Sequence, residues 1–580
     1  MKLREIYFPA FETAVKKSQP YTVMCSYNRI NGTYASEDPW LLTDILRDEW
    51  GFEGYVMSDW GAVNDRVEAL KAGLDLEMPS AGGVTDQEIM KAVRDGTLEE
   101  AVLDRAVERI LRISFRYLDN KKKPPFTLES DHDFACRIAE QSMVLLKNEE
   151  VLPLKEEEKI AFIGGFAKTP RFQGGGSSHI NSFRVSSALE AVSSIEKAAG
   201  NVTYAEGFRV DQDVYDETLA AEAIEAARQA DKAVIFAGLP ESFESESYDR
   251  AHMRLPDCQN RLISEIIKVQ PKTIVVLHNG SPVEMPWLSD VKGILEAYLG
   301  GQAVGEAEVR LLYGKVNPSG KLAETIPCKL TENPSYLTFG ESEKTVYSEG
   351  VFVGYRYYDA RQMQVAFPFG HGLSYTTFAY SNLKLNRHEL TDQDTLTVSV
   401  DITNTGKVRG KEIVQLYVRD NTGACRRPDK ELKGFEKISL EPGETKTVTM
   451  TLDHRSFAWY HTDLKDWYAA SGKYDILIGA SSRDIRLSDS VQMNTSVRLP
   501  LKLDLNVTLE ELASDDRTRK YGDYLKDKSY AYFNQYEGNG ALAGDMNHAL
   551  VDSMPMRSLV SFGICTKEEV LDVLNKLMEL

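Results

Sequence analysis

The chain has 580 residues and a mass of 65.1 kDa, which is more than one ordinary globular domain and predicts roughly three to five folding units. Its content of 42% hydrophobic and 27% charged residues excludes wholesale disorder. The formal net charge of −20 argues against nucleic acid and anionic membranes as its main partners.

Residues 1–118 alternate short apolar runs with amphipathic stretches. The runs Thr22–Cys25 and Gly54–Ser58 are predicted as buried strands, and Leu74–Met78 as a shorter third strand. Between the first two, leucines and isoleucines recur at three- and four-residue spacing and predict a helix over Pro39–Trp50. Strand–helix alternation predicts parallel strands joined by crossover helices. Two further helices are predicted over about Asn64–Ala72 and Leu103–Tyr117.

A break in this pattern, Lys121–Pro125, predicts a linker over residues 119–130. A second block of strand–helix alternation follows over residues 131–380 and predicts a separate α/β domain. Its helices include the alanine-rich stretch Thr218–Ala230. Its strands are predicted over Ile160–Gly164, Val202–Ala205, Ala233–Gly238, Thr273–His278 and Gly293–Tyr298.

Residues 381–497 change character, because apolar and polar residues alternate there with the period of two that is typical of half-buried strands. Turn residues at Asn404–Gly406 and Glu441–Gly443 separate these runs, and the pattern predicts a β-sandwich. Residues 498–580 form a mixed C-terminal extension that ends in a predicted helix, Lys567–Leu580. The alternating runs are Thr395–Ile402, Glu412–Val418 and Thr445–Leu452.

The cysteines, histidines and apolar runs exclude several kinds of site. The two cysteines closest in sequence, Cys258 and Cys328, are 70 positions apart, which excludes a disulfide scaffold and a cysteine zinc site. The nine histidines include no HExxH motif, so we expect neither a metal nor a cofactor. No apolar run reaches the roughly 18 residues of a membrane helix, and Met1–Glu5 lacks a signal-peptide core, so we expect no membrane partner and a cytoplasmic location. Assembly into a homo-oligomer is left open.

A candidate catalytic carboxylate directly follows one of the predicted buried strands. In the run Val56–Gly61, Asp59 comes at the C-terminal end of the strand, which is where parallel β/α architectures build their sites. Trp60 beside it suits a carboxylate that works next to a sugar ring. The alternative is that Asp59 only caps a helix N-terminus.

A second group of carboxylates follows the strand that ends at Gly238. The loop Glu244–Arg250 carries three acids, a tyrosine and an arginine in seven residues. Closely spaced acids raise one another's pKa, as a general acid requires at neutral pH. The alternative is a solvated polar loop without a function.

A glycine-rich stretch, Gly174–Ser178, matches neither the dinucleotide-binding nor the P-loop pattern. It therefore predicts a loop whose backbone approaches a neutral ligand or another domain.

These motifs occur in a characteristic order, and together they resemble a multidomain β-glucosidase of glycoside hydrolase family 3. The resemblance implies a (β/α)₈-type barrel, an α/β sandwich and a fibronectin type III-like domain, in the order of the three predicted blocks. The motifs are Val23–Asn28, Trp50–Phe52 leading into Met57–Trp60, Gly174–Ser178, Glu244–Arg250 and Phe367–Tyr375.

The resemblance also assigns roles to individual residues. Asp59 matches the nucleophile, and the acid/base falls on Glu246, with Glu244 as the alternative. The remaining matches are to sugar-lining positions: Met24, Tyr27, Trp60 and, in the glycine-rich loop, Ser177.

A retaining double displacement needs two carboxyl groups about 5–5.5 Å apart. Asp59 and Glu246 belong to different domains, so we expect the active site in the cleft between barrel and sandwich, with a small oligosaccharide or β-glucoside as substrate. The reaction implied is hydrolysis of terminal non-reducing β-D-glucosyl residues, and a β-xylosidase is the alternative.

The predicted barrel domain is short. A (β/α)₈ barrel takes about 250 residues, whereas only residues 1–118 precede the linker, so we expect the C-terminal half of a barrel. This leaves open a truncated chain, a missing half supplied by another chain, or a non-catalytic remnant that binds carbohydrate or a partner.

Overall fold

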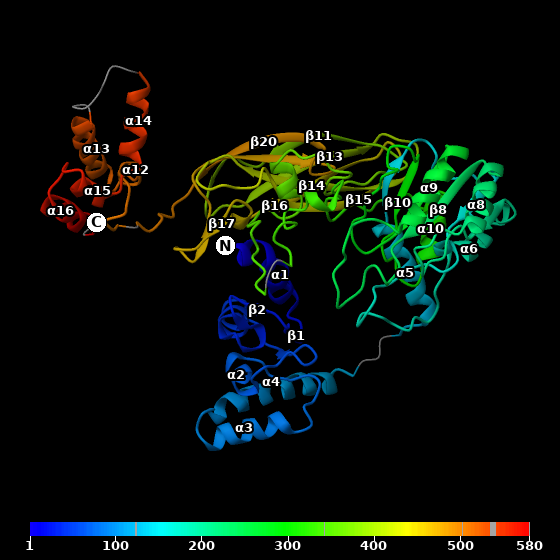
Figure 1. Cartoon of the computed structure of the whole chain (residues 1–580), viewed down its shortest axis with the longest axis horizontal. Coiled ribbons are helices and arrows are strands. Elements are labelled where there is room, and N and C mark those ends of the chain that lie inside the picture. The colour runs from blue at the N-terminus through cyan, green and yellow to red at the C-terminus, as the bar shows by residue number, and fades with distance from the viewer. Residues whose placement is uncertain (122–124, 341–342, 502, 534–540, 579–580) are drawn as a thin grey trace. The chain divides into compact units, whose positions relative to one another are not determined.

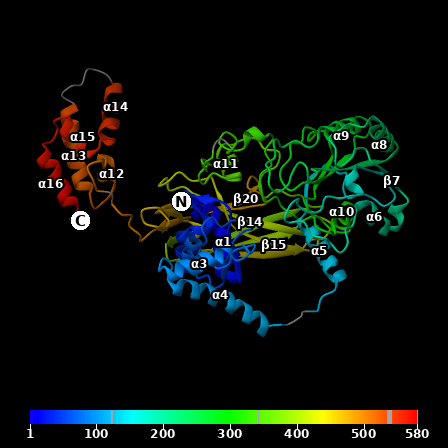
Figure 2. The ribbon, with the colours of Figure 1, turned by 60° about the horizontal axis from the view of Figure 1, so that its bottom comes forward.

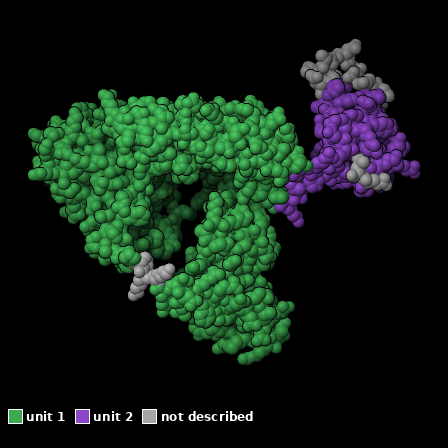
Figure 3. Space-filling model, turned by 180° about the vertical axis from the view of Figure 1, so that it is seen from behind, with its two compact units in different colours: residues 1–461, 466–496 green, residues 462–465, 497–580 purple. Residues whose placement is uncertain are grey.

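The computed structural model describes residues 1–121, 125–340, 343–501, 503–533 and 541–578. Residues 122–124 of the predicted linker and the last two residues of the predicted final helix lie outside the described residues. The chain divides into two units, residues 1–461 with 466–496 and residues 462–465 with 497–580 (Figure 3). The longer unit carries every candidate site residue.

The N-terminal segment is built around a parallel pair of short strands (Figure 1). Strand β1 pairs with β4, with Val23 opposite Val56, and an isolated bridge joins Met57 to Leu76. The first two predicted strands are therefore confirmed, whereas the third, Leu74–Met78, contributes only this bridge. The elements are η1 (Leu3–Tyr7), α1 (Phe8–Ser18), β1 (Thr22–Met24), β2 (Arg29–Ile30), β3 (Thr33–Tyr34), η2 (Ala35–Glu37), η3 (Trp40–Glu49), β4 (Tyr55–Met57), α2 (Arg66–Ala72), α3 (Val84–Arg94) and α4 (Glu100–Asp119).

Helices pack around this strand pair because their apolar positions recur on one face. Leu42 and Ile45 of η3 are buried with Val56 of β4 and with Phe8 of α1 in one hydrophobic cluster. The Asp65 carboxylate caps α2 by accepting hydrogen bonds from the backbone N–H groups of residues 67 and 68. The helices predicted over Pro39–Trp50, Asn64–Ala72 and Leu103–Tyr117 correspond to η3, α2 and α4.

A six-stranded sheet forms the centre of the α/β domain. Its order is β5-β10-β9-β8-β6-β7, and all neighbouring strands are parallel except β5, which pairs antiparallel with β10. The five predicted strands are confirmed, and β5 is an edge strand that was not predicted. The strands are β5 (Val144–Asn148), β6 (Ile160–Ile163), β7 (Val202–Ala205), β8 (Lys232–Gly238), β9 (Thr273–His278) and β10 (Gly293–Glu296).

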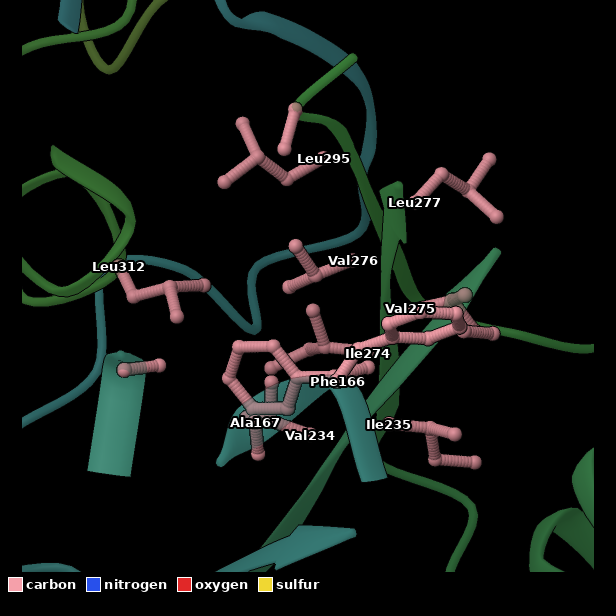
Figure 4. Close-up of a cluster of buried hydrophobic side chains, with 14 of the residues drawn as sticks. Phe166, Ala167, Val234, Ile235, Ile274, Val275, Val276, Leu277, Leu295 and Leu312 are labelled. Atoms are coloured by element: carbon pink, nitrogen blue, oxygen red, sulfur yellow. The ribbon is translucent and has the colours of Figure 1, made fainter. Parts of the chain in front are cut away.

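The central strands are buried along their whole length because helices cover both faces of the sheet. Every residue of β8 and β9 is buried, and Figure 4 shows side chains from these strands packed with Phe166 and Leu312. Helices α8 and α9 pack together, as does α10 with α5 and α6, and the helices flank the sheet in Figures 1 and 2. The helices are α5 (Leu128–Ser142), η4 (Gly165–Ala167), α6 (Ala188–Ala191), η5 (Val192–Ser194), α7 (Glu196–Ala199), α8 (Glu217–Gln229), α9 (Asp257–Val269), α10 (Val304–Leu312), η6 (Leu330–Glu332) and α11 (Tyr355–Ala360).

The β-sandwich consists of a three-stranded sheet, β11-β13-β16, and a five-stranded sheet, β12-β20-β19-β14-β15. Alternate residues of β13 are buried, which is the outcome of its period-two pattern. Two short strands, β17 and β18, pair separately. The elements are β11 (Phe378–Leu385), β12 (Glu389–Thr391), β13 (Leu396–Asn404), β14 (Gly410–Asp420), β15 (Glu431–Leu440), β16 (Thr445–Leu452), η7 (His454–Ser456), β17 (Trp459–His461), β18 (Asp466–Tyr468), β19 (Gly472–Gly479) and β20 (Ile485–Asn494).

The C-terminal unit is helical and has its own hydrophobic core, which includes Leu509, Leu525, Met556 and Leu577. Among the described residues, no helix is long and apolar enough to cross a membrane. The helices of this unit are α12 (Leu509–Ser514), α13 (Arg519–Phe533), α14 (Ala541–Asp552), α15 (Met556–Ser561) and α16 (Lys567–Met578).

Candidate active site

Asp59, the candidate nucleophile, lies two residues beyond β4, and its neighbours orient its carboxylate. The Trp60 backbone N–H donates to Asp59 Oδ1 at 2.7 Å, and the Tyr27 hydroxyl lies 3.1 Å from the same oxygen. The Tyr27 hydroxyl also lies 2.9 Å from the Trp60 carbonyl oxygen. The two strand ends therefore meet at the carboxylate, as parallel pairing of β1 and β4 requires.

The surroundings of Tyr27 favour its neutral, donating form. Desolvation raises its pKa, and so do its hydrogen bond to Asp59 and the negative charges of Asp59 and Glu246. Glu246, from the α/β domain, is therefore within electrostatic reach of the tyrosine that contacts Asp59.

A buried ion-pair cluster anchors the strand that carries Asp59. The side chain of Asp75 is only 1% exposed, and its Oδ2 accepts from the Val56 backbone N–H at 2.8 Å and from Arg47 Nη2 at 2.6 Å. Arg109 Nη1 reaches its Oδ1 at 2.9 Å. Loss of the Asp75 charge would leave the guanidinium groups of Arg47 and Arg109 without this partner. The carboxylate that holds the backbone of β4 is therefore costly to remove. Sequence reasoning missed this role, although an acid inside the apolar run Leu74–Met78 was the available signal.

The candidate sugar-lining side chains at these strand ends face solvent. Met24, Tyr27 and Trp60 are 54%, 55% and 53% exposed. The Tyr27 hydroxyl and the Trp60 backbone N–H both contact the Asp59 carboxylate. Met24 is the last residue of β1 and lies opposite Met57 of β4.

Glu246, the candidate acid/base, is exposed and rests against the glycine-rich loop. The Ser177 backbone N–H donates to Glu246 Oε2 at 2.5 Å, and the Glu246 N–H lies 3.4 Å from the Gly175 carbonyl oxygen. A Cβ on Gly176 would lie 2.5 Å from both Cβ and Oε2 of Glu246. Gly175 and Gly176 are therefore needed because another loop of the same domain packs on them. The predicted approach to a neutral ligand or another domain stays a prediction.

Glu244, the alternative acid/base, has a different environment. Its side chain is 17% exposed and pairs with the guanidinium of Arg171, Nη1 to Oε2, at 2.7 Å. The Gly280 backbone N–H donates to the same oxygen at 2.8 Å, and the Ser281 hydroxyl donates to Oε1. Glu244 is therefore a partly buried carboxylate with its acceptor positions occupied.

The pKa values of these two acids correct an expectation. Burial alone would raise the pKa of Glu244, but the hydrogen bonds from Ser281, Gly280 and Arg171 bring it below its ordinary value. The hydrogen bonds from the hydroxyl and backbone N–H of Ser177 likewise lower the pKa of Glu246. The prediction that the pKa values of these acids are raised was wrong, because donors on neighbouring loops lower both pKa values and outweigh desolvation.

Comparison with known families identifies all three blocks. Residues 1–113 match the glycosyl hydrolase family 3 N-terminal domain, residues 143–355 the glycosyl hydrolase family 3 C-terminal domain, and residues 412–482 the fibronectin type III-like domain. The predicted multidomain α/β plus β fold is thereby confirmed.

Individual relatives are similar over most of the chain. The chain is 52% identical to thermostable beta-glucosidase B of Acetivibrio thermocellus, covering 99% of this chain and 76% of that protein. It is 45% identical to an exo-alpha-(1->6)-L-arabinopyranosidase of Bifidobacterium breve, covering 83% of this chain and 65% of that protein. The crystal structure of a Bifidobacterium adolescentis GH3 β-glucosidase superposes with a TM-score of 0.84 at 44% identity, covering 90% of this chain and 76% of that one.

The chain thus spans between about two thirds and three quarters of the length of these proteins. Their names confirm, at the level of the family, the prediction of an O-glycosyl hydrolase of the β-glucosidase type. By its domains and its relatives, the chain belongs to glycoside hydrolase family 3.

Proposed function

We propose that this chain carries the catalytic residues of a retaining β-glucosidase, with Asp59 as nucleophile and Glu246 as acid/base. The observation that carries the proposal is the contrast between the two carboxylates around Tyr27. Asp59 is fixed at a strand end by Tyr27 and the Trp60 N–H, whereas Glu246 sits on an exposed loop whose charge Tyr27 still senses. Double displacement needs one carboxylate as the nucleophile and a second carboxyl group as the proton donor at the same glycosidic bond.

In the first step, an oxygen of Asp59 attacks the anomeric carbon while the bond from that carbon to the leaving oxygen breaks. Glu246 gives its proton to the leaving oxygen. In the second step, the ionised Glu246 takes a proton from water, whose oxygen attacks the anomeric carbon and releases Asp59. Tyr27, which stays neutral, donates to the Asp59 carboxylate before attack and again after its release.

For the first step, substrate binding has to raise the pKa of Glu246, which is lowered in the free chain. In the free chain, Ser177 lowers this pKa and keeps the carboxyl ionised at neutral pH. A sugar that covers Glu246 removes water, and a sugar hydroxyl that binds Ser177 competes for its donors. Both changes raise the pKa of Glu246 and favour the protonated acid. Ser177 thus takes part in sugar binding, and Met24, Tyr27 and Trp60 line the sugar ring.

Residues 1–118 supply the C-terminal part of a (β/α)₈-type barrel in this proposal. Support comes from the parallel pair β1–β4 with its bridge to Leu76, since a closed barrel has eight strands. Further support comes from helix α4, on which an apolar stripe at helical spacing is exposed. The stripe consists of Val107, Leu111, Phe115 and Leu118, which are 45–58% exposed. A buried neighbour for this stripe is what the remaining barrel elements would provide.

The substrate is a terminal β-D-glucoside in this proposal, and the relatives do not favour the alternatives of a β-xylosidase or a non-catalytic remnant. The arabinopyranosidase relative makes a pentopyranoside a substrate to include in any test. The cytoplasmic location stays a prediction, and assembly into a homo-oligomer stays open.

The test is hydrolysis of p-nitrophenyl β-D-glucoside, with the β-D-xyloside and α-L-arabinopyranoside beside it. We expect turnover by the wild type, none by Asp59→Asn, and azide rescue of Glu246→Ala but not of Asp59→Asn, because azide replaces the water that the acid/base activates. Unchanged turnover in either variant would overturn the assignment. A chimaera tests the barrel proposal: the first barrel strands of a relative are fused in front of residue 1. We expect it to be more active than the 580-residue chain.

A further inference from the structure

The second acid of the catalytic loop, Glu244, joins three strand ends of the sheet. Arg171 follows β6, Leu239 follows β8, and Gly280 and Ser281 follow β9. Arg171 Nη1 donates to Glu244 Oε2 at 2.7 Å and to the Leu239 carbonyl oxygen at 2.9 Å. Its Nη2 donates to the Glu244 carbonyl oxygen at 2.9 Å. One guanidinium thus holds both the side chain and the backbone of Glu244.

The neighbouring contacts make this arrangement rigid. The side chain of Arg171 is 4% exposed, and its carbonyl oxygen lies 3.3 Å from Nδ1 of the fully buried His278. Arg250, at the far end of the loop, donates to the Ser281 hydroxyl at 2.7 Å and to the Pro282 carbonyl oxygen at 3.0 Å. Ser281 therefore links the two ends of the loop, Glu244 on one side and Arg250 on the other.

Between these anchors, residues 245–249 are exposed or only half-buried. Glu246 itself contacts the glycine-rich loop through Ser177 and Gly175. These contacts involve groups that the sugar has to reach, so they are poorly suited to hold Glu246 once substrate binds. The contacts of Glu244 are instead with Arg171, Gly280 and Ser281, which the proposed sugar contacts do not use.

We propose that Glu244 and Arg171 form a positioning pair that fixes the loop so that Glu246 meets the leaving oxygen. Glu244 is not itself the proton donor, because protonation would break its pairing with Arg171 and its hydrogen bond from Gly280. The inference rests on the proposed role of Glu246 and adds the residues on which that role depends.

The test compares Glu244→Gln with a matched control, Glu241→Gln, in the full chain. Glu241 lies on the same segment, is 54% exposed, and its carboxylate lies 3.8 Å from the His179 side chain. The substrates are phenyl β-glucoside, whose leaving group needs a proton, and 2,4-dinitrophenyl β-glucoside, whose leaving group does not. The value of kcat/KM reports the first step alone.

In Glu244→Gln we expect kcat/KM to fall about 10²-fold for the phenyl glucoside and less than about fivefold for the dinitrophenyl glucoside, because only the former depends on a positioned acid. Glu241→Gln should stay within about twofold of the wild type for both. Equal losses for the two substrates, or no loss, overturn the proposal. If Glu244→Gln does not fold, Ser281→Ala, which removes one donor from the carboxylate, decides by the same criterion.

A second readout separates this proposal from the proposed activity. If the wild-type chain hydrolyses no glycoside, the proposed activity fails for this chain, and amide hydrogen exchange then decides the positioning role. The Gly280 and Glu246 amides should exchange at least about tenfold faster in Glu244→Gln than in Glu241→Gln. The Gly280 amide then faces a neutral carboxamide, which is a weaker acceptor than a carboxylate, and the Glu246 amide belongs to a loop that has lost its ion pair with Arg171. Unchanged exchange at both amides overturns the inference.

Discussion

Replacing Gly176 by alanine tests how closely the position of Glu246 is set by the glycine-rich loop. The added Cβ would lie 2.5 Å from Cβ and from Oε2 of Glu246. Carbon atoms in contact are about 3.5–4.0 Å apart, so one loop has to move by about 1 Å or more. A misplacement of about 1 Å reduces catalysis by about 10²-fold. We therefore expect kcat/KM for phenyl β-glucoside to fall by about two orders of magnitude.

Backbone strain has to be separated from this displacement, because Gly176 has φ of +96° and an alanine there is strained as well. Gly301 is a suitable control, since its φ is +75° and a Cβ there would meet nothing within 4 Å. Both alanine variants should lose roughly 1–2 kcal/mol of stability, seen as a lower Tm, but only Gly176→Ala should lose the large share of activity. Equal activity losses in the two variants would show that backbone strain, and not displacement of Glu246, lowers the activity.

Two further predictions concern buried ionisable side chains. Burial raises the pKa of Glu296 to about 8 from 4.5, so the folded state keeps a proton that the unfolded state releases, and the free energy of unfolding falls as pH rises through this window. Glu296→Gln should therefore gain stability relative to the wild type from pH 4.5 to 8, by roughly 5 kcal/mol at most, in urea denaturation; a pH-independent difference would contradict this. Arg427 pairs with Glu5 at 2.6 Å and Glu431 at 2.7 Å, all with side chains under 15% exposed. Arg427→Met should cost about 3–5 kcal/mol, because Glu5 loses its ion-pair partner and Glu431 is left with Arg356 and Lys433. Arg112→Met, at the exposed pair with Glu108, should cost less than about 1 kcal/mol, and similar losses in the two variants would argue against this prediction.

The fold was predictable wherever the buried positions form a simple pattern in the sequence. The strands Val202–Ala205 and Thr273–His278 have the predicted bounds, because short apolar runs between helices have few other solutions. Strand β5 was missed because its apolar run, Val144–Leu146, is only three residues long and directly follows α5, and because its partner β10 lies far along the chain. Leu74–Met78 looks like a full strand, yet the charge of Asp75 is used to anchor β4 instead.

The candidate site was predictable to the level of residue types and strand ends. Asp59 and Tyr27 meet because parallel strands bring their C-terminal ends to one edge. The partners of Glu244 were not predictable, since Arg171 lies 73 positions away in the chain and nothing local indicates their pairing. The direction of the pKa shifts was missed for the same reason, because the donors that lower the pKa of Glu244 come from other loops.

The central claim is that Asp59 is the nucleophile of a retaining reaction in this chain. A 2-deoxy-2-fluoroglucoside with a dinitrophenyl leaving group slows the second step more than release of its leaving group, so the glycosyl-enzyme accumulates and can be digested and sequenced by mass spectrometry. We expect one glycosyl adduct, on the carboxyl of Asp59, and none in Asp59→Asn. An adduct on another carboxylate, or no adduct under conditions in which a retaining relative is fully labelled, would contradict it.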